Sequence, residues 1–237
     1  MKTILIKELP TQCLLDQEAK RLNGSISFYE QDEALLKSNL NIRAFGASRN
    51  DPDASKIEII LHSVPRLGLA LGALTGSISF GPKTTGIYNV SFFGEAHIEF
   101  GENCTSNGVN VTAMGGSLKV GADCMFADNI AIYLGDNHGV VDVTTGELLS
   151  STMSETTIEE HVWIGAASRI MKNAHVGKGS IIATNSIVTG KRFAPCSLIA
   201  GNPAQIKRSN TSWTRSTGGR EWPQIQDRFD LRASASE

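Results

Sequence analysis

The stretch from Ile158 to Val188, IEEHVWIGAASRIMKNAHVGKGSIIATNSIV, decides the fold. An aliphatic residue occupies every sixth position of this stretch: Ile158, Ile164, Ile170, Val176, Ile182 and Val188. Small residues follow in a fixed register, either four positions later or directly after: Ser168, Ala174, Ser180 and Ser186, and Gly165, Gly177 and Ala183. Neither a helix, with its period of 3.6, nor a simple strand, with its period of 2, gives a period of six. The pattern indicates an internal repeat.

A six-residue unit of this kind can supply one short strand and one turn. Three units close a triangular coil of 18 residues with every aliphatic side chain inside, and successive coils stack at the strand spacing of about 4.8 Å. The alternative is an ordinary sandwich with coincidental spacing, and six consecutive matches with small residues in register argue against it. The sequence therefore predicts an all-β parallel solenoid. Its open ends and flat faces predict an oligomer.

The repeat extends towards the N-terminus and weakens there. Val120, Phe126 and Ile132 keep the register, and the segments 57–61 and 77–80 still resemble short strands between turns. The expected organisation has four parts: irregular early β coils over 1–97, a regular solenoid over 98–207, a protruding loop over 139–156 and a C-terminal tail over 208–237.

Composition excludes several classes of protein. The 237 residues carry 22 Lys and Arg against 24 Asp and Glu, a net charge of -2, so no overall basic field indicates a nucleic-acid binder. The four cysteines form no CxxC pair, which favours buried reduced thiols over a zinc site. The longest small-apolar run, 67–74, is too short to cross a bilayer. We expect a cytoplasmic protein without a membrane span.

Basic charge is concentrated near the C-terminus. Between His161 and Arg220 there is no Asp or Glu, and nine residues are basic: Arg169, Lys172, Lys178, Lys191, Arg192, Lys207, Arg208, Arg215 and Arg220. The rest of the chain carries 13 basic residues against 24 acidic ones. Such a segment needs either an anionic ligand, such as the phosphates of coenzyme A, or an acidic neighbour within the oligomer.

His138 stands where the repeat is interrupted, directly before the predicted loop. Loops on a rigid scaffold commonly carry catalytic groups, and a histidine can exchange protons near neutral pH. We expect His138 to act as a general base, with Asp136 or a backbone carbonyl holding its other ring nitrogen. The alternative role is a hydrogen bond that ends a strand.

Three segments carry a family resemblance: HVWIG at 161–165, GKGSIIATNSIV at 177–188 and PCSLIAGNPAQIK at 195–207. They resemble the last coils of the hexapeptide-repeat acyltransferases. Residues 124–138, followed by DVTTGE at 142–147, are similar to the sugar and polysaccharide O-acetyltransferases of that family. The likeness covers about residues 98–215. It implies a left-handed parallel β-helix, a homotrimer, and an acetyl-CoA site between neighbouring subunits.

The resemblance also implies site residues. It puts Trp163 beside His138 in the catalytic site and assigns cofactor contacts to Ala166, Ala183, Thr184, Thr189, Lys191, Lys207 and Arg208. Because Ile164 takes the inward position, we expect the Trp163 indole to face outward, lining either a subunit contact or the substrate channel. Two departures from the family bear on these contacts: Gly190 precedes Lys191, and Ala183 to Asn185 replace a segment that often contains glycine.

The function expected from this resemblance is transfer of an acetyl group from acetyl-CoA to a saccharide hydroxyl, with no metal expected. An amino sugar is a second acceptor class, since the same base serves an amine. The alternative that is not an enzyme is a non-catalytic trimeric scaffold. A metal-dependent hydratase would need a three-histidine site, and the spacing of His97, His161 and His175 does not favour one.

Overall fold

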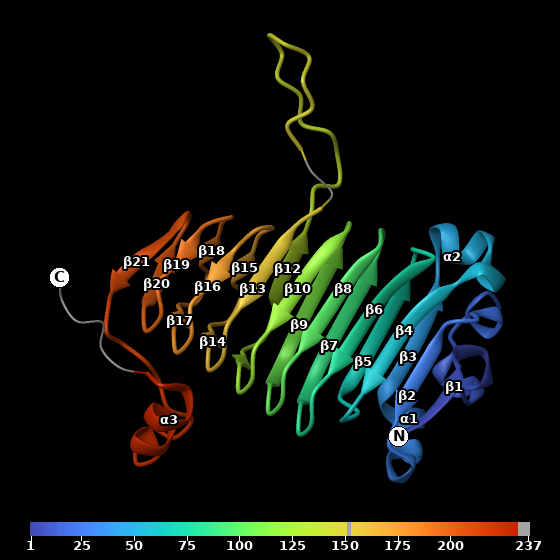
Figure 1. Cartoon of the computed structure of the whole chain (residues 1–237), viewed down its shortest axis with the longest axis horizontal. Coiled ribbons are helices and arrows are strands. Elements are labelled where there is room, and N and C mark those ends of the chain that lie inside the picture. Colours follow the sequence, from blue (N-terminus) through green and yellow to red (C-terminus); the bar gives the residue numbers. More distant parts are fainter. Residues whose placement is uncertain (151–152, 232–237) are drawn as a thin grey trace.

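The computed structural model describes residues 1–150 and 153–231 of the chain. Two positions of the predicted loop, 151–152, and the end of the predicted tail, 232–237, lie outside the described residues. Figure 1 shows one elongated stack of strands, with the N-terminus at one end, a long arm projecting from its middle, and the last helix beside its other end. The strands from β2 to β20 pair in parallel between coils, whereas β1 and β21 pair antiparallel at the two ends of the stack. The fold is a left-handed parallel β-helix, as predicted.

The strands form two sheets, and one strand of the second sheet has three neighbours. In order, the first sheet contains β1 (Lys2–Leu5), β2 (Ser25–Phe28), β4 (Lys56–Leu61), β6 (Thr75–Phe80), β8 (Ala96–Phe100), β10 (Gly116–Val120), β13 (Glu155–Ile158), β16 (His175–Val176) and β19 (Arg192–Phe193). The second contains β3 (Leu40–Ala44), β5 (Arg66–Leu71), β7 (Thr85–Phe92) and β9 (Thr105–Ala113), after which it divides. One branch is β11 (Met125–Phe126), β14 (Trp163–Ile164), β17 (Ile181–Ile182), β20 (Leu198–Gly201) and β21 (Ala204–Arg208). The other is β12 (Ile130–Leu134), β15 (Arg169–Ile170) and β18 (Ile187–Val188).

The division at β9 changes the shape of the coil. The start of β9 pairs with β11 and its end pairs with β12, so one wide face becomes two narrow faces. Before this point Ile78, Ile98 and Leu118 pair in register at intervals of 20 residues. After it, Ile164 pairs with Ile182, which is the predicted interval of 18. The coils from β6 to β10 are therefore regular, with a longer repeat, whereas the first coils are irregular as expected, with β2 and β4 paired at an interval of 33 residues and β3 and β5 at 27.

The core follows the six-residue pattern. The six aliphatic residues that define the repeat are fully buried, and so are the small residues at Ser168, Ala174, Ser180 and Ser186. The four cysteines are buried and free, as predicted. In the early coils aromatic rings fill the interior, and Phe80 stacks on Phe100 with ring centroids 5.0 Å apart. Burial of these side chains holds successive coils together.

The corners of the coils rely on residues in the left-handed backbone region. Asn103, Asp123 and His161 have φ of 57°, 61° and 54° and stack at one corner. Their amides donate to the neighbouring coil, for example Asp123 N–H to Glu102 O at 2.8 Å and His161 N–H to Ala122 O at 2.8 Å. Asn and Asp tolerate this backbone region better than most residues. A column of polar side chains results at this corner.

Helices and the tail cover parts of the stack. α1 (Glu33–Asn39), with Leu36 buried, and α2 (Gly46–Asn50) lie among the first coils, together with 3-10 helices at Ile6–Glu8, Thr11–Cys13, Ala19–Arg21, Glu30–Asp32 and Pro52–Ala54. Beyond β21 the chain leads to α3 (Trp222–Phe229). Across 1–150 and 153–231, no helix combines the length and the apolar character that a bilayer crossing requires.

Candidate active site

The arm between β12 and β13 is a hairpin that projects from the solenoid (Figure 1). Val141 forms an antiparallel bridge with Leu148. At the tip, Asp142 Oδ1 accepts hydrogen bonds from the amides of Thr144 and Thr145 at 2.7 and 2.9 Å. These bonds favour the carboxylate and lower the pKa of Asp142. The arm ends at Glu155, where β13 begins, so the last two residues of the predicted loop are strand.

The arm presents apolar side chains to solvent. Its exposed large hydrophobic residues include Val140, Val141, Val143, Leu148 and Leu149. Val143 is 99% exposed, so this apolar surface has no cover within the described chain. Exposed apolar patches of this kind mark interaction surfaces.

His138 lies at the root of the arm, four residues beyond β12, and its side chain is exposed. It forms no hydrogen bond or ion pair with the described residues. Asp136, one of the two groups expected to orient the imidazole, instead forms an ion pair with Lys172, on the turn that follows β15. The arm root is thus tied to the next coil by an ion pair, while the histidine stays open to a ligand.

The predicted donor-binding residues divide between two edges of the solenoid. Thr189 and Lys191 follow β18, so they lie along the edge that also carries His138 and Lys172. Ala166 and Thr184 lie along another edge, where Asn185 N–H donates to Ala166 O at 2.9 Å. The face made by β12, β15 and β18 separates the two edges. One chain therefore does not bring all these residues together.

The backbone groups of Ala183 are already in use. Its N–H donates to Ile199 O at 2.8 Å, and its carbonyl accepts from Ser168 Oγ at 3.0 Å. Because both groups have partners inside the solenoid, the expected backbone contact from Ala183 to a ligand amide does not fit this arrangement. Thr184, the other residue of that expectation, is exposed.

The basic residues of the segment 161–220 have several different neighbours. Lys172 and Arg215 pair with the carboxylates of Asp136 and Asp123. Three of the predicted phosphate-binding residues are exposed and form no ion pair with the described chain: Lys191, Lys207 and Arg208. Part of the basic segment thus packs against acidic residues of its own chain, and part stays open to an anion.

Trp163 faces outward from β14, as predicted, with 37% of its surface exposed. Its indole lies 6.2 Å from that of Trp213, centroid to centroid, at an angle of 50°. Trp213 belongs to the tail, and it packs against a side corner of the solenoid.

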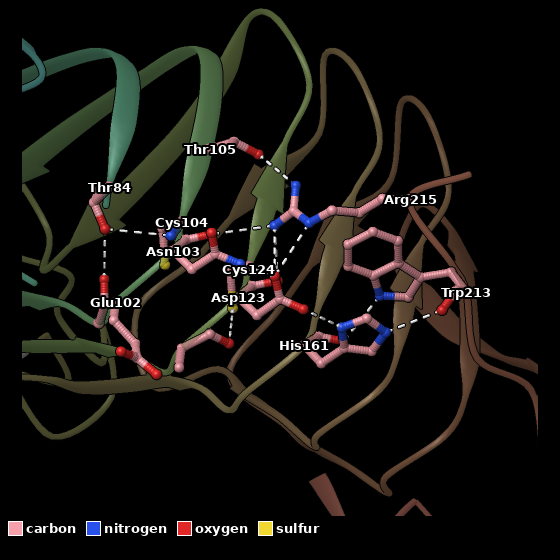
Figure 2. A network of polar contacts seen from close by, with 12 residues as sticks. Thr84, Glu102, Asn103, Cys104, Thr105, Asp123, Cys124, His161, Trp213 and Arg215 are labelled. Atoms are coloured by element: carbon pink, nitrogen blue, oxygen red, sulfur yellow. Dashed lines mark hydrogen bonds and ion pairs between the residues drawn. The ribbon is translucent and has the colours of Figure 1, made fainter. Parts of the chain in front are cut away.

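Figure 2 shows the polar contacts that hold the tail at this corner. The His161 ring is fully buried, with Nδ1 2.7 Å from Asp123 Oδ2 and Nε2 3.0 Å from Trp213 O. The ring thus bridges the carboxylate of the corner and the backbone of the tail.

Arg215 supplies a positive charge beside the carboxylate of Asp123 at this corner. Its guanidinium donates to Asp123 Oδ1 at 2.8 Å and to Thr105 Oγ1 at 3.0 Å (Figure 2). Burial alone would raise the pKa of Asp123, but the hydrogen bonds from His161 and Arg215 outweigh it, and the pKa lies below its ordinary value. Asp123 is thus a buried carboxylate that forms an ion pair with Arg215 and a hydrogen bond with His161.

Comparisons with known proteins agree with this architecture. Residues 155–190 match the bacterial transferase hexapeptide (six repeats) family. These residues are similar to the hexapeptide repeats of that family. The polysialic acid O-acetyltransferase of Escherichia coli O1:K1 / APEC is 33% identical over 99 residues, which are 42% of this chain and 32% of that protein. This hexapeptide-repeat chain therefore spans about a third of the length of that relative.

Solved structures resemble the fold of this hexapeptide-repeat protein. The polySia-specific acetyltransferase NeuO has a TM-score of 0.67 at 18% identity, over 86% of this chain and 91% of that one. A point mutant of AntD, an N-acyltransferase from Bacillus cereus solved with dTDP-4-amino-4,6-dideoxyglucose and coenzyme A, has a TM-score of 0.51 at 16% identity. That match covers 86% of this chain and 97% of the other.

Sequence reasoning missed the corner network of this hexapeptide-repeat protein. It considered His161 as a metal ligand, whereas in 1–150 and 153–231 no group of three His, Cys, Asp or Glu side chains is arranged to hold a metal. His161 and Trp213 are 52 residues apart, and Asp123 and Arg215 are 92 apart. Their contact follows from the return of the tail, and no local motif signals it.

Proposed function

We propose that this protein is an acetyltransferase that moves an acetyl group from acetyl-CoA to a sugar hydroxyl, in a surface or capsular polysaccharide or its precursor. The observation that carries the proposal is His138, exposed and without a side-chain partner among the described residues, at the root of an arm on a hexapeptide solenoid. The similarity to a polysialic acid O-acetyltransferase supports a saccharide acceptor.

His138 acts as the general base in this proposal. It takes the proton from the acceptor hydroxyl while the hydroxyl oxygen attacks the thioester carbonyl. The carbon–sulfur bond then breaks, and His138 returns the proton to the departing coenzyme A thiolate. No covalent acyl-enzyme is required, because the acceptor attacks the thioester directly.

The donor binds between subunits of a homotrimer. This follows from the separation of the two edges, since His138 on one chain needs the edge with Ala166 and Thr184 on another. Thr189, Lys191, Lys207 and Arg208 contact the phosphate-bearing end, where cations are favourable. Trp163 lines the channel beside the catalytic base. The apolar arm reaches towards the neighbouring chain, which is the cover that its exposed side chains lack.

Calorimetric titration with acetyl-CoA tests the donor without knowledge of the acceptor. We expect one saturable site per chain, weakened in Lys191→Ala and Arg208→Ala, together with a trimeric mass by light scattering. A matched variant, Lys20→Ala, removes an exposed cation from the N-terminal coils and should bind as the wild type does. A trimer that binds no acetyl-CoA up to millimolar concentration would be a scaffold, and the proposal would be wrong.

The acceptor atom is tested separately. The same base can deprotonate an amine, so an N-acetyltransferase acting on an amino sugar is the second candidate. Thiol release from acetyl-CoA, followed over matched pairs of sugars that carry either an amine or a hydroxyl at one position, separates the two. Turnover restricted to the amine would replace the O-acetyltransferase proposal.

A further inference from the structure

The outer surface of β3, β5, β7, β9 and β12 carries many polar side chains, with the exposed apolar side chains of Leu15 and Ile87 at its N-terminal end. Two columns of side chains run across these strands, as the pairing registers show. The first column is Asn41, Gly68, Asn89, Asn110 and Ala131. The second is Arg43, Ala70, Ser91, Thr112 and Tyr133. Amides and hydroxyls dominate both columns.

Small residues leave a groove in this surface at its N-terminal end. Gly68, Ala70 and Ser91 form the floor of a groove of about 400 Å³, with Asn41 and Asn89 along it. Asn89 Nδ2 donates to Asn110 Oδ1 at 3.2 Å, so the amides form a row that leads out of the groove. Amides and hydroxyls both donate and accept hydrogen bonds, which matches them to sugar hydroxyls.

Two arginines flank the groove without partners of their own. Arg43 and Arg66 are exposed, and neither forms a hydrogen bond or an ion pair with the described residues. No described Asp or Glu lines this groove. Asp16 lines the adjacent hollow, but its two oxygens accept from the amides of Ala19 and Ala44. The groove therefore presents two arginine side chains that form no ion pair with the described residues.

The columns lead from the arginines to the candidate catalytic base. Four strand spacings separate β3 from β12, roughly 19 Å at about 4.8 Å each. The second column ends at Tyr133, and the chain leaves β12 one residue later and reaches His138 at the arm root. An occupant lying along the columns would have one end at the arginines and the other near His138.

We infer that this face is a binding groove for an acidic oligosaccharide, with Arg43 and Arg66 contacting carboxylates of sugar units distant from the unit near His138. The inference rests on the proposed function, because it names the acceptor class. Unpaired arginines favour carboxylate-bearing sugars over neutral ones. The length of the columns favours a polymer over a single sugar.

Direct binding measured without acetyl-CoA tests the groove separately from catalysis. The probes are a sialic acid oligomer, an oligogalacturonate, an uncharged maltooligosaccharide and thymidine diphosphate. We expect both acidic oligomers to bind, with an affinity that falls as salt rises. Arg43→Ala/Arg66→Ala should weaken this binding about tenfold or more. Lys20→Ala/Lys37→Ala, matched in charge and also in the N-terminal coils, should leave it unchanged. Ser91→Trp should block the floor while keeping both arginines.

Several results would overturn the inference. They are equal affinity for acidic and neutral oligomers, binding of the diphosphate alone, no binding of either acidic oligomer, and an unchanged affinity in the double arginine variant. A change of oligomeric mass in that variant would assign the face to a subunit contact instead. Binding of an acidic oligomer without any acetyl transfer would refute the proposed function and keep the groove. Acetyl transfer by the double arginine variant, with an unchanged KM for the acidic oligomer, would refute the groove and keep the proposed function.

Discussion

The imidazole of His161 lies parallel to the indole of Trp213, with ring centroids 4.3 Å apart, and each side chain hydrogen-bonds the backbone carbonyl of the other residue. His161 belongs to a corner of the solenoid, and Trp213 belongs to the tail. Two hydrogen bonds and a stacked ring pair therefore join segments that are 52 residues apart in the sequence. The tail is an integral part of the corner.

Trp213→Ala should destabilise the protein strongly. The indole is 5% exposed, and loss of a buried Trp side chain costs about 3–5 kcal/mol. Urea unfolding, with limited proteolysis of the tail, measures the effect. Trp163→Ala is the matched control, since its indole is partly exposed and should contribute less. A change below about 1 kcal/mol for Trp213→Ala would mean that other contacts hold the tail.

Asp123 should make stability depend on pH in the acid range. Its pKa is lowered in the folded state, so its contribution is fully present above the ordinary value of about 3.9 and is lost as the pH falls through the lower folded pKa. Asp123→Asn should flatten the pH dependence of the unfolding free energy in that window. The variant should also be less stable at neutral pH, because Arg215 then lacks its counter-charge.

Unfolding curves at several pH values for the wild type, Asp123→Asn and Glu58→Gln test this expectation. Glu58 is exposed on β4, so its replacement should keep the wild-type profile. If the unfolding free energy of Asp123→Asn fell at acid pH as that of the wild type does, other carboxyl groups would control acid unfolding.

The sequence predicted the regular coils because each six-residue repeat contains the residues that determine its packing. An aliphatic residue at every sixth position, with small residues in register, leaves one simple arrangement, and those aliphatic residues are buried as expected. The coils that contain β6, β8 and β10 were harder to predict because their interval is 20 residues and their strands are longer. The signal was present, since Ile78, Ile98 and Leu118 occupy equivalent positions. A search limited to six-residue periods does not find it.

Parts of the candidate site could not be predicted from local patterns. The ion pair of Asp136 with Lys172 depends on the stacking of two coils across the inserted arm. The corner network depends on the path of the tail. The groove at Arg43 and Arg66 depends on the parallel pairing of β3 with β5, which the sequence analysis did not assign. Each arises from residues that are distant in sequence and adjacent in the stack.

Lys172→Met should lower the turnover number without lowering stability much. The pair with Asp136 ties the arm root to the next coil, and both side chains are partly exposed. Its loss lets His138 shift, and small displacements of a catalytic group cost about tenfold or more in rate. Lys172→Arg should restore most of the rate, because it keeps the charge. We expect the KM for acetyl-CoA to stay constant, which separates a positioning effect from lost donor binding.

An unchanged turnover number in Lys172→Met would show that the ion pair does not position the base. A rise in the KM for acetyl-CoA, with the turnover number unchanged, would assign Lys172 to donor binding instead. Thermal unfolding of the variant distinguishes both results from a general loss of structure.

His138→Ala should lower turnover by about 10²-fold or more while leaving ligand binding intact. The side chain is exposed and forms no hydrogen bond or ion pair with the described residues, so its removal should leave the fold and the affinity for acetyl-CoA unchanged. His97→Ala is the matched control, because His97 is also exposed, on β8, where it contacts Ser77. Full turnover in His138→Ala would remove this residue from the mechanism. A loss of acetyl-CoA affinity equal to the loss of rate would make His138 a binding group, since a general base acts on the chemical step and leaves donor affinity in place.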